Sequence, residues 1–360
     1  MHLSNIYLNN FKNHLESNFE LIDGINCFVG KNGIGKTNVL DAIHYLCLTK
    51  SYYNKSDTLN INFDNDYFTL KGNFINDEDE YELICSLSKN TSKLVKLNGK
   101  RYKRFSDHIG KFPIVIISPT DSNLIIEGPE VRRRYLNSSI SQFDNNYLTN
   151  LIEYNRALKH RNKLLKSLNE GAKIDNITIE AFNFTLSQKS KYIFDSRKKF
   201  VDEINSIFQK FYGIISKSKE TVNLEYISHL KNNSMSELLE NNIEIDKISK
   251  STTHGPHKDD ISLVMNNRLI KRFGSQGQQK TFLVSLKLAQ FELLEKINNI
   301  KPILLLDDIF DKLDNNRVEE LLSLVDKGFF SQVFITDTSE KRCNKLLKQL
   351  RTNYTIFSLS

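Results

Sequence analysis

Residues 30–37 read Gly30-Lys31-Asn32-Gly33-Ile34-Gly35-Lys36-Thr37, which fits the spacing Gly-x-x-x-x-Gly-Lys-Ser/Thr of a phosphate-binding P-loop. The mostly apolar run 25–29 before it predicts a buried strand, and the apolar residues of 39–46 after it recur at helical spacing. The motif therefore lies between a predicted strand and a predicted helix, which is the context in which such a loop binds phosphate.

The residue types of this loop suit a nucleoside triphosphate. Glycines allow backbone N–H groups to turn inward around a phosphate, and the N-terminus of the following helix adds partial positive charge. We expect Lys36 to reach the β- and γ-phosphates and the Thr37 hydroxyl to coordinate Mg²⁺. The predicted nucleotide-binding residues of the loop are Gly30, Lys31, Asn32, Gly33, Ile34, Gly35, Lys36 and Thr37.

The composition is that of a soluble globular protein, with 39% hydrophobic and 26% charged residues in 360, enough chain for about two domains. The formal net charge of +7 permits an acidic partner such as nucleic acid but does not require one. Four scattered cysteines without a Cys-x-x-Cys pair indicate buried apolar positions in a reducing compartment. We find no signal peptide and no run of membrane-spanning length, and we expect a cytoplasmic protein without a membrane partner.

The remaining patterns predict a mixed α/β fold. Short alternating segments over 66–102, with an Asn98-Gly99 turn, indicate an antiparallel subdomain, and the apolar runs 114–117, 303–306 and 333–335 indicate buried parallel strands. Helical spacing over about 129–165 and 179–212 predicts two long amphipathic helices, joined near Gly171, that form an arm. We therefore predict residues 1–120 and 251–360 to form one nucleotide-binding head, with the helical arm 121–250 inserted between its two parts.

Two carboxylates follow the apolar run 303–306. Asp307 is predicted to lie at the C-terminal tip of a core strand and to hold Mg²⁺, directly or through water. Asp308 would point differently and polarise the attacking water, so it is the predicted catalytic residue.

Several further motifs give the chain its resemblance to a known family. The segment Ser275-Gln276-Gly277-Gln278-Gln279-Lys280-Thr281 resembles the signature motif of SMC-class ABC ATPases, and 311–317 resembles their D-loop, with Asp314 as its acid. Within that class the chain is most similar to the RecF family, through Ser-Gln-Gly-Gln-Gln-Lys, the paired aspartates, the cluster 254–260 and the segments 118–121 and 127–134. The resemblance spans essentially the whole chain, and the gap between P-loop and signature is too short for the long coiled coils of SMC proteins.

This resemblance implies an ABC-type P-loop ATPase head that works as an ATP-dependent homodimer, with Ser275, Gly277 and Gln278 contacting the nucleotide of the other subunit. It implies a weak ATPase that binds duplex DNA at junctions with single-strand gaps. It also implies that the protein acts with other recombination mediators in replication, recombinational repair and the SOS response. The alternative is a structural DNA clamp in which ATP binding suffices and hydrolysis is incidental.

Some residues depart from the family pattern or leave their role open. Lys12 stands where relatives commonly have Arg, so we expect any bidentate phosphate contact there to become a point-charge one. No Q-loop glutamine follows 114–117, which leaves that Mg²⁺ ligand unassigned. Thr336 replaces the expected switch histidine, so we expect weaker sensing of the γ-phosphate and slow turnover. The cluster 254–260 is interpreted as a polar loop bracing the nucleotide-binding part rather than as a metal site. The candidates for DNA contact are Arg132, Arg133, Arg156 and Lys159, with further basic residues up to Lys166, including Arg161, on the same predicted helix.

Overall fold

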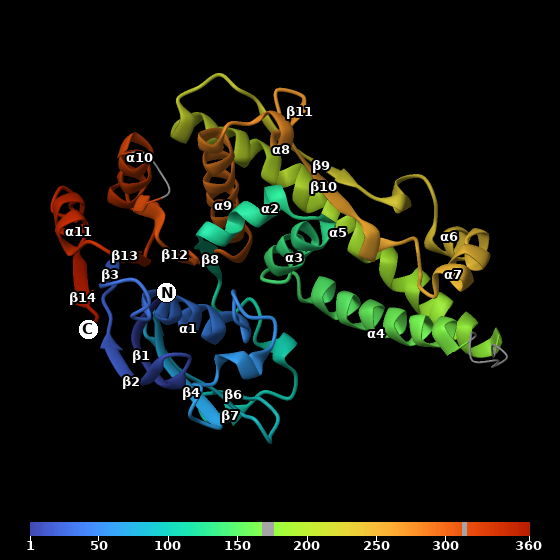
Figure 1. Ribbon diagram of the computed structural model, residues 1–360, viewed down its shortest axis with the longest axis horizontal. Helices are drawn as coiled ribbons and strands as arrows, with labels where there is room; N and C mark the ends of the chain where they lie inside the picture. Colours follow the sequence, from blue (N-terminus) through green and yellow to red (C-terminus); the bar gives the residue numbers. More distant parts are fainter. Residues whose placement is uncertain (168–175, 312–314) are drawn as a thin grey trace. The chain divides into compact units, whose positions relative to one another are not determined.

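The computed structural model describes residues 1–167, 176–311 and 315–360 (Figure 1). The chain divides into two compact units. The first unit contains residues 1–122, 210–219 and 275–360, and the second contains 123–209 and 220–274.

A parallel five-stranded sheet with the order β14-β3-β13-β12-β8 forms the centre of the first unit. Its strands are β3 (Ile25–Val29), β8 (Ile114–Ile117), β12 (Ile303–Leu306), β13 (Val333–Asp337) and β14 (Tyr354–Ser358). All residues of β3, β8, β12 and β13 are buried, which is why these segments are mostly apolar in sequence. The sheet therefore joins strands from both ends of the chain, as predicted.

A second, antiparallel sheet with the order β2-β1-β4-β5-β6-β7 belongs to the same unit. Its strands are β1 (His2–Phe11), β2 (His14–Glu20), β4 (Tyr67–Asn76), β5 (Asp79–Ser88), β6 (Leu94–Leu97) and β7 (Lys100–Arg101). The predicted Asn98-Gly99 turn is confirmed, because Leu97 pairs with Lys100 across it. Helix α1 (Lys36–Leu48) packs against strands of both sheets, so the hydrophobic core of the unit surrounds the helix that follows the P-loop (Figure 1).

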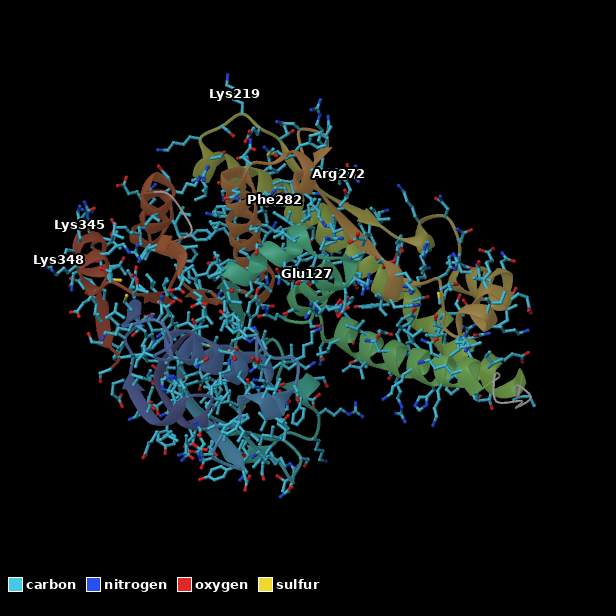
Figure 2. All side chains as sticks on the ribbon, in the orientation of Figure 1. Glu127, Lys219, Arg272, Phe282, Lys345 and Lys348 are labelled. Atoms are coloured by element: carbon cyan, nitrogen blue, oxygen red, sulfur yellow. The ribbon has the colours of Figure 1, made fainter. Side chains whose placement is uncertain are left out.

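The first unit also contains α9 (Gln276–Asn298), α10 (Asn315–Asp326) and α11 (Glu340–Leu347). In α9 Phe282 is fully buried, and in α11 Cys343 and Leu347 are buried. Lys345 of α11 and Lys348, the residue after this helix, are exposed; Figure 2 labels both. α11 therefore buries apolar residues against the unit and keeps these two lysines in solvent.

The second unit is mainly helical. Its helices are α2 (Asn123–Ile126), α3 (Pro129–Ile140), α4 (Asn145–Ser167), α5 (Asn176–Ser216, of which 210–216 are grouped with the first unit), α6 (Met235–Asn241), α7 (Ile243–Ser249) and α8 (Ile270–Phe273). A small antiparallel sheet has the order β11-β10-β9, with β9 (Val222–Ile227), β10 (Asp260–Met265) and β11 (Arg268–Leu269).

The arm departs from the sequence-based expectation in three respects. Residues 210–219, which we expected in the arm, are grouped with the first unit. The first predicted helix is interrupted at 141–144, where the Asp144 carboxylate accepts a hydrogen bond of 2.8 Å from the Tyr147 backbone N–H and so caps α4. Residues 251–274, which we expected in the head, are grouped with the second unit because β10 pairs with β9. The predicted junction near Gly171 lies outside the described residues.

The cysteines occupy buried positions, as the sequence predicted. All four cysteines are buried and free, and the Sγ atoms of Cys27 and Cys343 lie 3.2 Å apart. Within the part of the chain that the structure describes, no helix is both long and apolar enough to cross a bilayer.

Candidate nucleotide-binding site

The P-loop connects β3 to α1 and depends on glycine at both ends. Gly30 has a φ of 155°, and a Cβ there would lie 2.8 Å from the carbonyl oxygen of Leu359. Gly35 has a φ of 113°, and a Cβ there would lie 2.6 Å from the Asn13 side chain. Larger residues at these positions would be strained and would also clash. The predicted strand–loop–helix context of the motif is therefore confirmed.

The Lys36 ammonium lies within its own loop. Its Nζ donates hydrogen bonds of 2.7 Å to the carbonyl oxygen of Gly30 and 3.0 Å to that of Lys31, and the residue is only 5% exposed. Next to it, a ring nitrogen of His14 lies 3.1 Å from the carbonyl oxygen of Gly35, and burial lowers the pKa of His14. The loop thus encloses the Lys36 ammonium, and the His14 ring of β2 packs against its Gly35 end.

Asp307 follows β12 directly, and its carboxylate accepts hydrogen bonds from three hydroxyl groups. Oδ1 accepts bonds of 2.8 Å from Thr37 Oγ1 and 2.8 Å from Thr336 Oγ1. Oδ2 accepts a bond of 2.7 Å from the Tyr53 hydroxyl, whose pKa is raised well above its usual value by burial and by the Asp307 charge. The structure therefore brings the two predicted metal ligands, Thr37 and Asp307, into direct contact.

Asp308 continues the chain in a different direction from Asp307. Its φ of 47° lies in the left-handed region, and its backbone N–H donates a bond of 2.9 Å to Thr336 Oγ1. Thr336, on β13, thus accepts from the backbone of one aspartate and donates to the side chain of the other. The residue in place of the expected switch histidine acts as a brace for the acidic pair.

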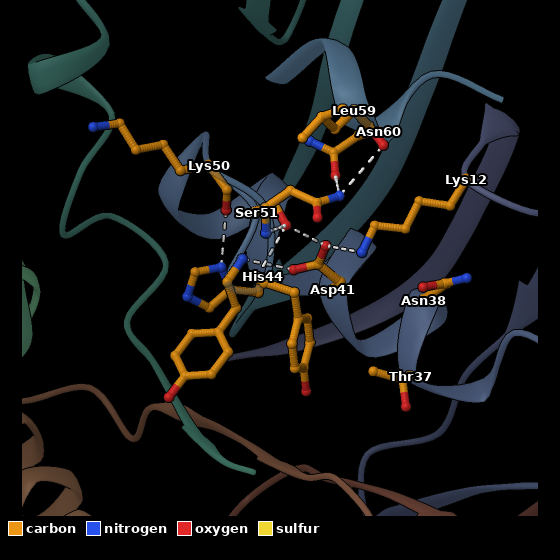
Figure 3. A network of polar contacts seen from close by, with 12 residues as sticks. Lys12, Thr37, Asn38, Asp41, His44, Lys50, Ser51, Leu59 and Asn60 are labelled. Atoms are coloured by element: carbon orange, nitrogen blue, oxygen red, sulfur yellow. Dashed lines mark hydrogen bonds and ion pairs between the residues drawn. The ribbon is translucent and has the colours of Figure 1, made fainter. Parts of the chain in front are cut away.

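Asp41, on the P-loop helix α1, is the centre of a polar network, shown in Figure 3. Its carboxylate forms a 2.6 Å ion pair with Lys12 Nζ and accepts bonds of 2.6 Å from Ser51 Oγ and 2.7 Å from the Tyr52 backbone N–H. Lys12 is the residue for which we expected a point-charge contact with phosphate. Its ammonium is paired with the buried Asp41 carboxylate.

The segment after β8 contacts α9, the helix that begins at the predicted signature motif. Lys287 of α9 forms a 2.8 Å ion pair with Asp121, and both side chains are almost fully buried. The Tyr52 hydroxyl donates to the same Asp121 oxygen over 2.5 Å. Asp121 thus lies in the segment where a Q-loop glutamine was sought, and its carboxylate is paired with a cation.

The predicted signature residues lie at the start of α9. Ser275 is the N-cap: its Oγ accepts a bond of 3.2 Å from the Gln278 backbone N–H, and the Gln278 side chain accepts a bond of 2.7 Å from the Ser275 backbone N–H. This capping box fixes the start of the 23-residue helix α9, so the motif forms the first turn of that helix. Gly277 lies next to Arg317, whose Nη1 would be 3.2 Å from a Cβ there. The D-loop acid Asp314 lies outside the described residues.

Comparison with known proteins identifies the family. The family model described as RecF/RecN/SMC N-terminal domain matches residues 2–358. A DNA replication and repair protein RecF from Flavobacterium johnsoniae is 46% identical over 359 residues, which cover 100% of both chains. The RecF of Bacteroides thetaiotaomicron is 42% identical over 99% of this chain and 96% of its own. The chain belongs to the RecF family.

Solved structures agree with this membership. A structure described as the recombination mediator protein RecF with ATP in the RecFOR pathway is 30% identical, with a TM-score of 0.89, and the match covers 99% of this chain and 95% of that one. The Smc head domain of Pyrococcus furiosus is 17% identical, with a TM-score of 0.57, and the match covers 100% of this chain and 94% of that one, so it shares the fold. The RecF-family chain therefore has the ABC-type P-loop ATPase fold that its motifs predicted.

The four DNA-contact candidates occupy different environments. Arg132 forms a bidentate ion pair with Asp260, with distances of 2.6 and 2.9 Å, and Nη1 of Arg133 donates a 2.7 Å bond to the carbonyl oxygen of Asp259. Arg156 and Lys159 on α4 are exposed. The first two therefore brace the second unit, whereas the second two are open to solvent.

Arg161, which we had expected on the basic surface of the same helix, is fully buried. Its Nη1 forms a 2.7 Å ion pair with Asp246 and donates a 2.8 Å bond to Thr252. A buried arginine requires such partners because an unpaired charge in the interior is costly. The basic surface of α4 therefore excludes Arg161.

The cluster 254–260 stabilises the second unit rather than the nucleotide-binding part. Asp259 forms a buried 2.8 Å ion pair with Arg197, and the His257 ring lies 2.7 Å from the Tyr154 hydroxyl. No group of three or more potential metal-binding side chains is found among residues 1–167, 176–311 and 315–360. The cluster is therefore a bracing polar loop, but it braces the second unit and not, as we had expected, the nucleotide-binding part.

Sequence reasoning missed Tyr53, Asp41 and His14 as members of the site. Tyr53 contacts Asp307 across 254 residues of sequence, and His14 contacts Gly35 from the antiparallel sheet. None of the three belongs to a short motif with a known spacing. The one available signal was the position of Asp41 between apolar residues of α1, where a buried acid requires a partner.

Proposed function

We propose that this chain binds ATP with Mg²⁺, hydrolyses it slowly, and holds DNA as an ATP-dependent homodimer during replication and recombinational repair. The proposed DNA target is duplex next to a single-strand gap, where the dimer acts with other recombination mediators to load recombinase. The SOS response is the proposed setting in the cell.

The contact between Thr37 and Asp307 carries this proposal. It joins the end of the P-loop to the tip of β12 through a 2.8 Å hydrogen bond, so the loop that suits phosphates and the acid that suits their metal form one site. The likeness to the RecF–ATP structure, at 30% identity over nearly the whole chain, supports the same nucleotide. The proposed binding residues remain the eight of the loop, with the Lys36 ammonium on the β- and γ-phosphates.

The two oxygen atoms also fit Mg²⁺. This ion prefers oxygen ligands and is usually held by one or two protein groups together with phosphates and water. When bound, it would neutralise charge on the β- and γ-phosphates. Thr37 and Asp307 would hold it, with the carboxylate kept in place by Thr336 and Tyr53.

We assign the water-activating role to Asp308 and the dimer contact to the start of α9. A general base of this kind contributes roughly 10²–10⁴-fold to a rate. The N-terminus of α9, with Ser275, Gly277 and Gln278, suits the γ-phosphate bound by a second copy because helix N-termini favour anions. The bound triphosphate then links two copies, and its hydrolysis removes that link.

The exposed basic residues of α4 support DNA binding. Besides Arg156 and Lys159, the exposed basic residues of this helix are His160, Lys163 and Lys166. Such a surface contacts phosphates without reading bases, which agrees with a protein that recognises DNA structure.

Fluorescent ATP-analogue binding and sedimentation test the proposal. We expect wild-type protein to bind the analogue and to sediment as a dimer with ATP but not with ADP. Lys36→Ala should lose nucleotide binding, and Ser275→Arg should bind nucleotide but remain monomeric. Lys345→Ala, which removes an exposed lysine of α11 in the same unit, is the matched control. A chain that binds no nucleotide, or that hydrolyses ATP at full rate as a monomer, contradicts the proposal.

A further inference from the structure

Tyr53 contacts the acidic residue of the site from a segment that no motif marks. Its hydroxyl donates a 2.7 Å hydrogen bond to Asp307 Oδ2, the oxygen opposite the one that accepts from Thr37 and Thr336. A carboxylate bonded on one oxygen can still rotate about its Cβ–Cγ bond. A donor on the second oxygen fixes the plane of the group and keeps Oδ1 towards Thr37.

The ring of Tyr53 is itself held from two sides. Lys12 Nζ lies 5.4 Å from the centre of the ring, and the Tyr52 ring packs edge-on at 5.3 Å between centroids. A cation over an aromatic ring is attracted by the electron-rich face, and the attraction grows where water is excluded. The Tyr53 hydroxyl is thus presented by a ring with little freedom to move.

The backbone around Tyr53 is tied to the P-loop helix. Ser51 Oγ accepts bonds of 3.2 Å from the Tyr53 N–H and 2.9 Å from the Asn54 N–H, and it donates a 2.6 Å bond to Asp41. The same Asp41 carboxylate pairs with Lys12, and Figure 3 shows Lys12, Asp41 and Ser51 joined in this network. Asp41 lies on α1, one turn beyond Thr37, so one helix carries Thr37 and anchors the segment that carries Tyr53.

We propose that Tyr53 is the positioning residue that orients Asp307 towards Thr37 for Mg²⁺. The inference rests on the proposed function, because it assumes that these two side chains hold the metal of a bound nucleotide. Groups that orient a metal ligand in this way commonly change metal affinity 10- to 100-fold when removed. Tyr53 would act on the metal dependence of nucleotide binding and not on the phosphate contacts themselves.

Tyr53→Phe removes only the hydroxyl and keeps the ring that packs on Lys12 and Tyr52. We would titrate Mg²⁺ into protein with a fluorescent ATP analogue and measure the Mg²⁺ concentration at half-saturation. For Tyr53→Phe we expect this concentration to rise 10- to 100-fold, while the affinity for the analogue in EDTA stays within about twofold of wild type.

Tyr52→Phe is the matched control. It removes the same atom from the neighbouring residue of the same segment, but its hydroxyl contacts Asp121 and not Asp307. We expect its Mg²⁺ midpoint to equal that of wild type. Ser51→Ala loosens the segment through its bonds to Asp41 and to the Tyr53 backbone, without removing a contact to Asp307. It should raise the Mg²⁺ midpoint as Tyr53→Phe does, but by a smaller factor. Melting curves in EDTA would confirm that each variant is folded.

The outcomes separate this inference from the proposed function. If wild type shows Mg²⁺-dependent binding and Tyr53→Phe has the same midpoint, the positioning role is wrong and the nucleotide site stands. A Tyr52→Phe shift as large as that of Tyr53→Phe also overturns the role, because the effect would then belong to the segment and not to the Asp307 contact. If wild type itself binds no nucleotide, both are overturned.

Discussion

The Thr37 hydroxyl donates a 2.8 Å hydrogen bond to Asp307, although 270 residues separate the two in the sequence. Thr37 lies in the first turn of α1, and Asp307 follows the last residue of β12. The contact is possible because β3, which leads into the P-loop, and β12 lie in one parallel sheet with β13 between them. Carboxyl ends of parallel strands meet at one edge, which is where ligands of such sheets bind.

Replacing Thr37 by Val tests this contact, because the change keeps the branched shape and removes the hydroxyl. We expect the Mg²⁺ concentration for half-maximal nucleotide binding to rise about tenfold or more, since a metal ligand and a donor to Asp307 are both lost. Thr37→Ser, which keeps the hydroxyl, should stay near wild type. Equal midpoints for the Val and Ser variants would show that the hydroxyl does not contact the metal.

Asp308→Asn separates hydrolysis from binding. The change removes the proposed base and keeps the size of the side chain, so we expect ATP hydrolysis to fall by roughly 10²–10⁴-fold. The ATP-bound dimer should then persist, and dissociation from DNA should slow greatly. Steady-state hydrolysis, sedimentation with ATP and a DNA dissociation time course measure the three effects. Unchanged DNA dissociation with hydrolysis abolished would instead favour a structural clamp in which hydrolysis is incidental.

The parts of this site that sequence predicts are those coded by local patterns. The P-loop and Asp307 were predictable because each lies next to an apolar strand that can be read from consecutive residues. Tyr53 was not, because its role depends on which strand tip lies opposite, and two consecutive tyrosines at 52–53 carry no spacing signal. The strand order that decides this is a property of the folded sheet.

The arm shows the same limit in another form. Helical periodicity predicted long helices over 129–165 and 179–212, yet the first is broken at 141–144 because Asp144 caps a new helix. Periodicity also placed Arg161 among the basic surface residues. The structure buries it because Asp246 of α7 supplies a carboxylate that no local pattern connects to α4.

The stability of the protein should depend on pH through His257. Burial lowers the pKa of His257 to about 4 from an ordinary value of 6.5. Between these values the unfolded chain binds more protons than the folded one, so the free energy of unfolding rises with pH in this window and falls as the pH drops from about 6.5 to 4. Over this window His257 lowers the free energy of unfolding by roughly 3 kcal/mol in total as the pH falls.

His257→Gln removes this titration while keeping a donor for Thr252 and an acceptor for Tyr154, which contact the two ring nitrogens at 2.8 and 2.7 Å. We expect a flatter dependence of the free energy of unfolding on pH between 4 and 6.5, measured by urea denaturation at several pH values. Burial raises the pKa of Asp259, which acts in the opposite direction, but this group is present in both proteins and drops out of the comparison. Parallel pH profiles would show that His257 does not titrate differently on folding.

The exposed basic residues of α4 give a prediction for DNA binding. In a protein that contacts DNA phosphates, each neutralised phosphate contributes about 0.9 to the slope of log affinity against log salt. Replacing Arg156 and Lys159 by Ala should therefore weaken DNA binding and reduce the slope by about 2. Fluorescence anisotropy with gapped duplex DNA between 50 and 300 mM salt, roughly the range where such slopes are measured, supplies both values.

Lys198→Ala/Lys199→Ala is the matched control, because it also removes two exposed cations from a helix of the second unit, here α5. Its slope should equal that of wild type. Arg132→Ala should behave differently from both double variants, since it breaks the bidentate pair with Asp260. It should lower the melting temperature and leave the salt slope unchanged. If both double variants reduce the slope equally, the effect comes from net charge, and α4 does not form a DNA-binding surface.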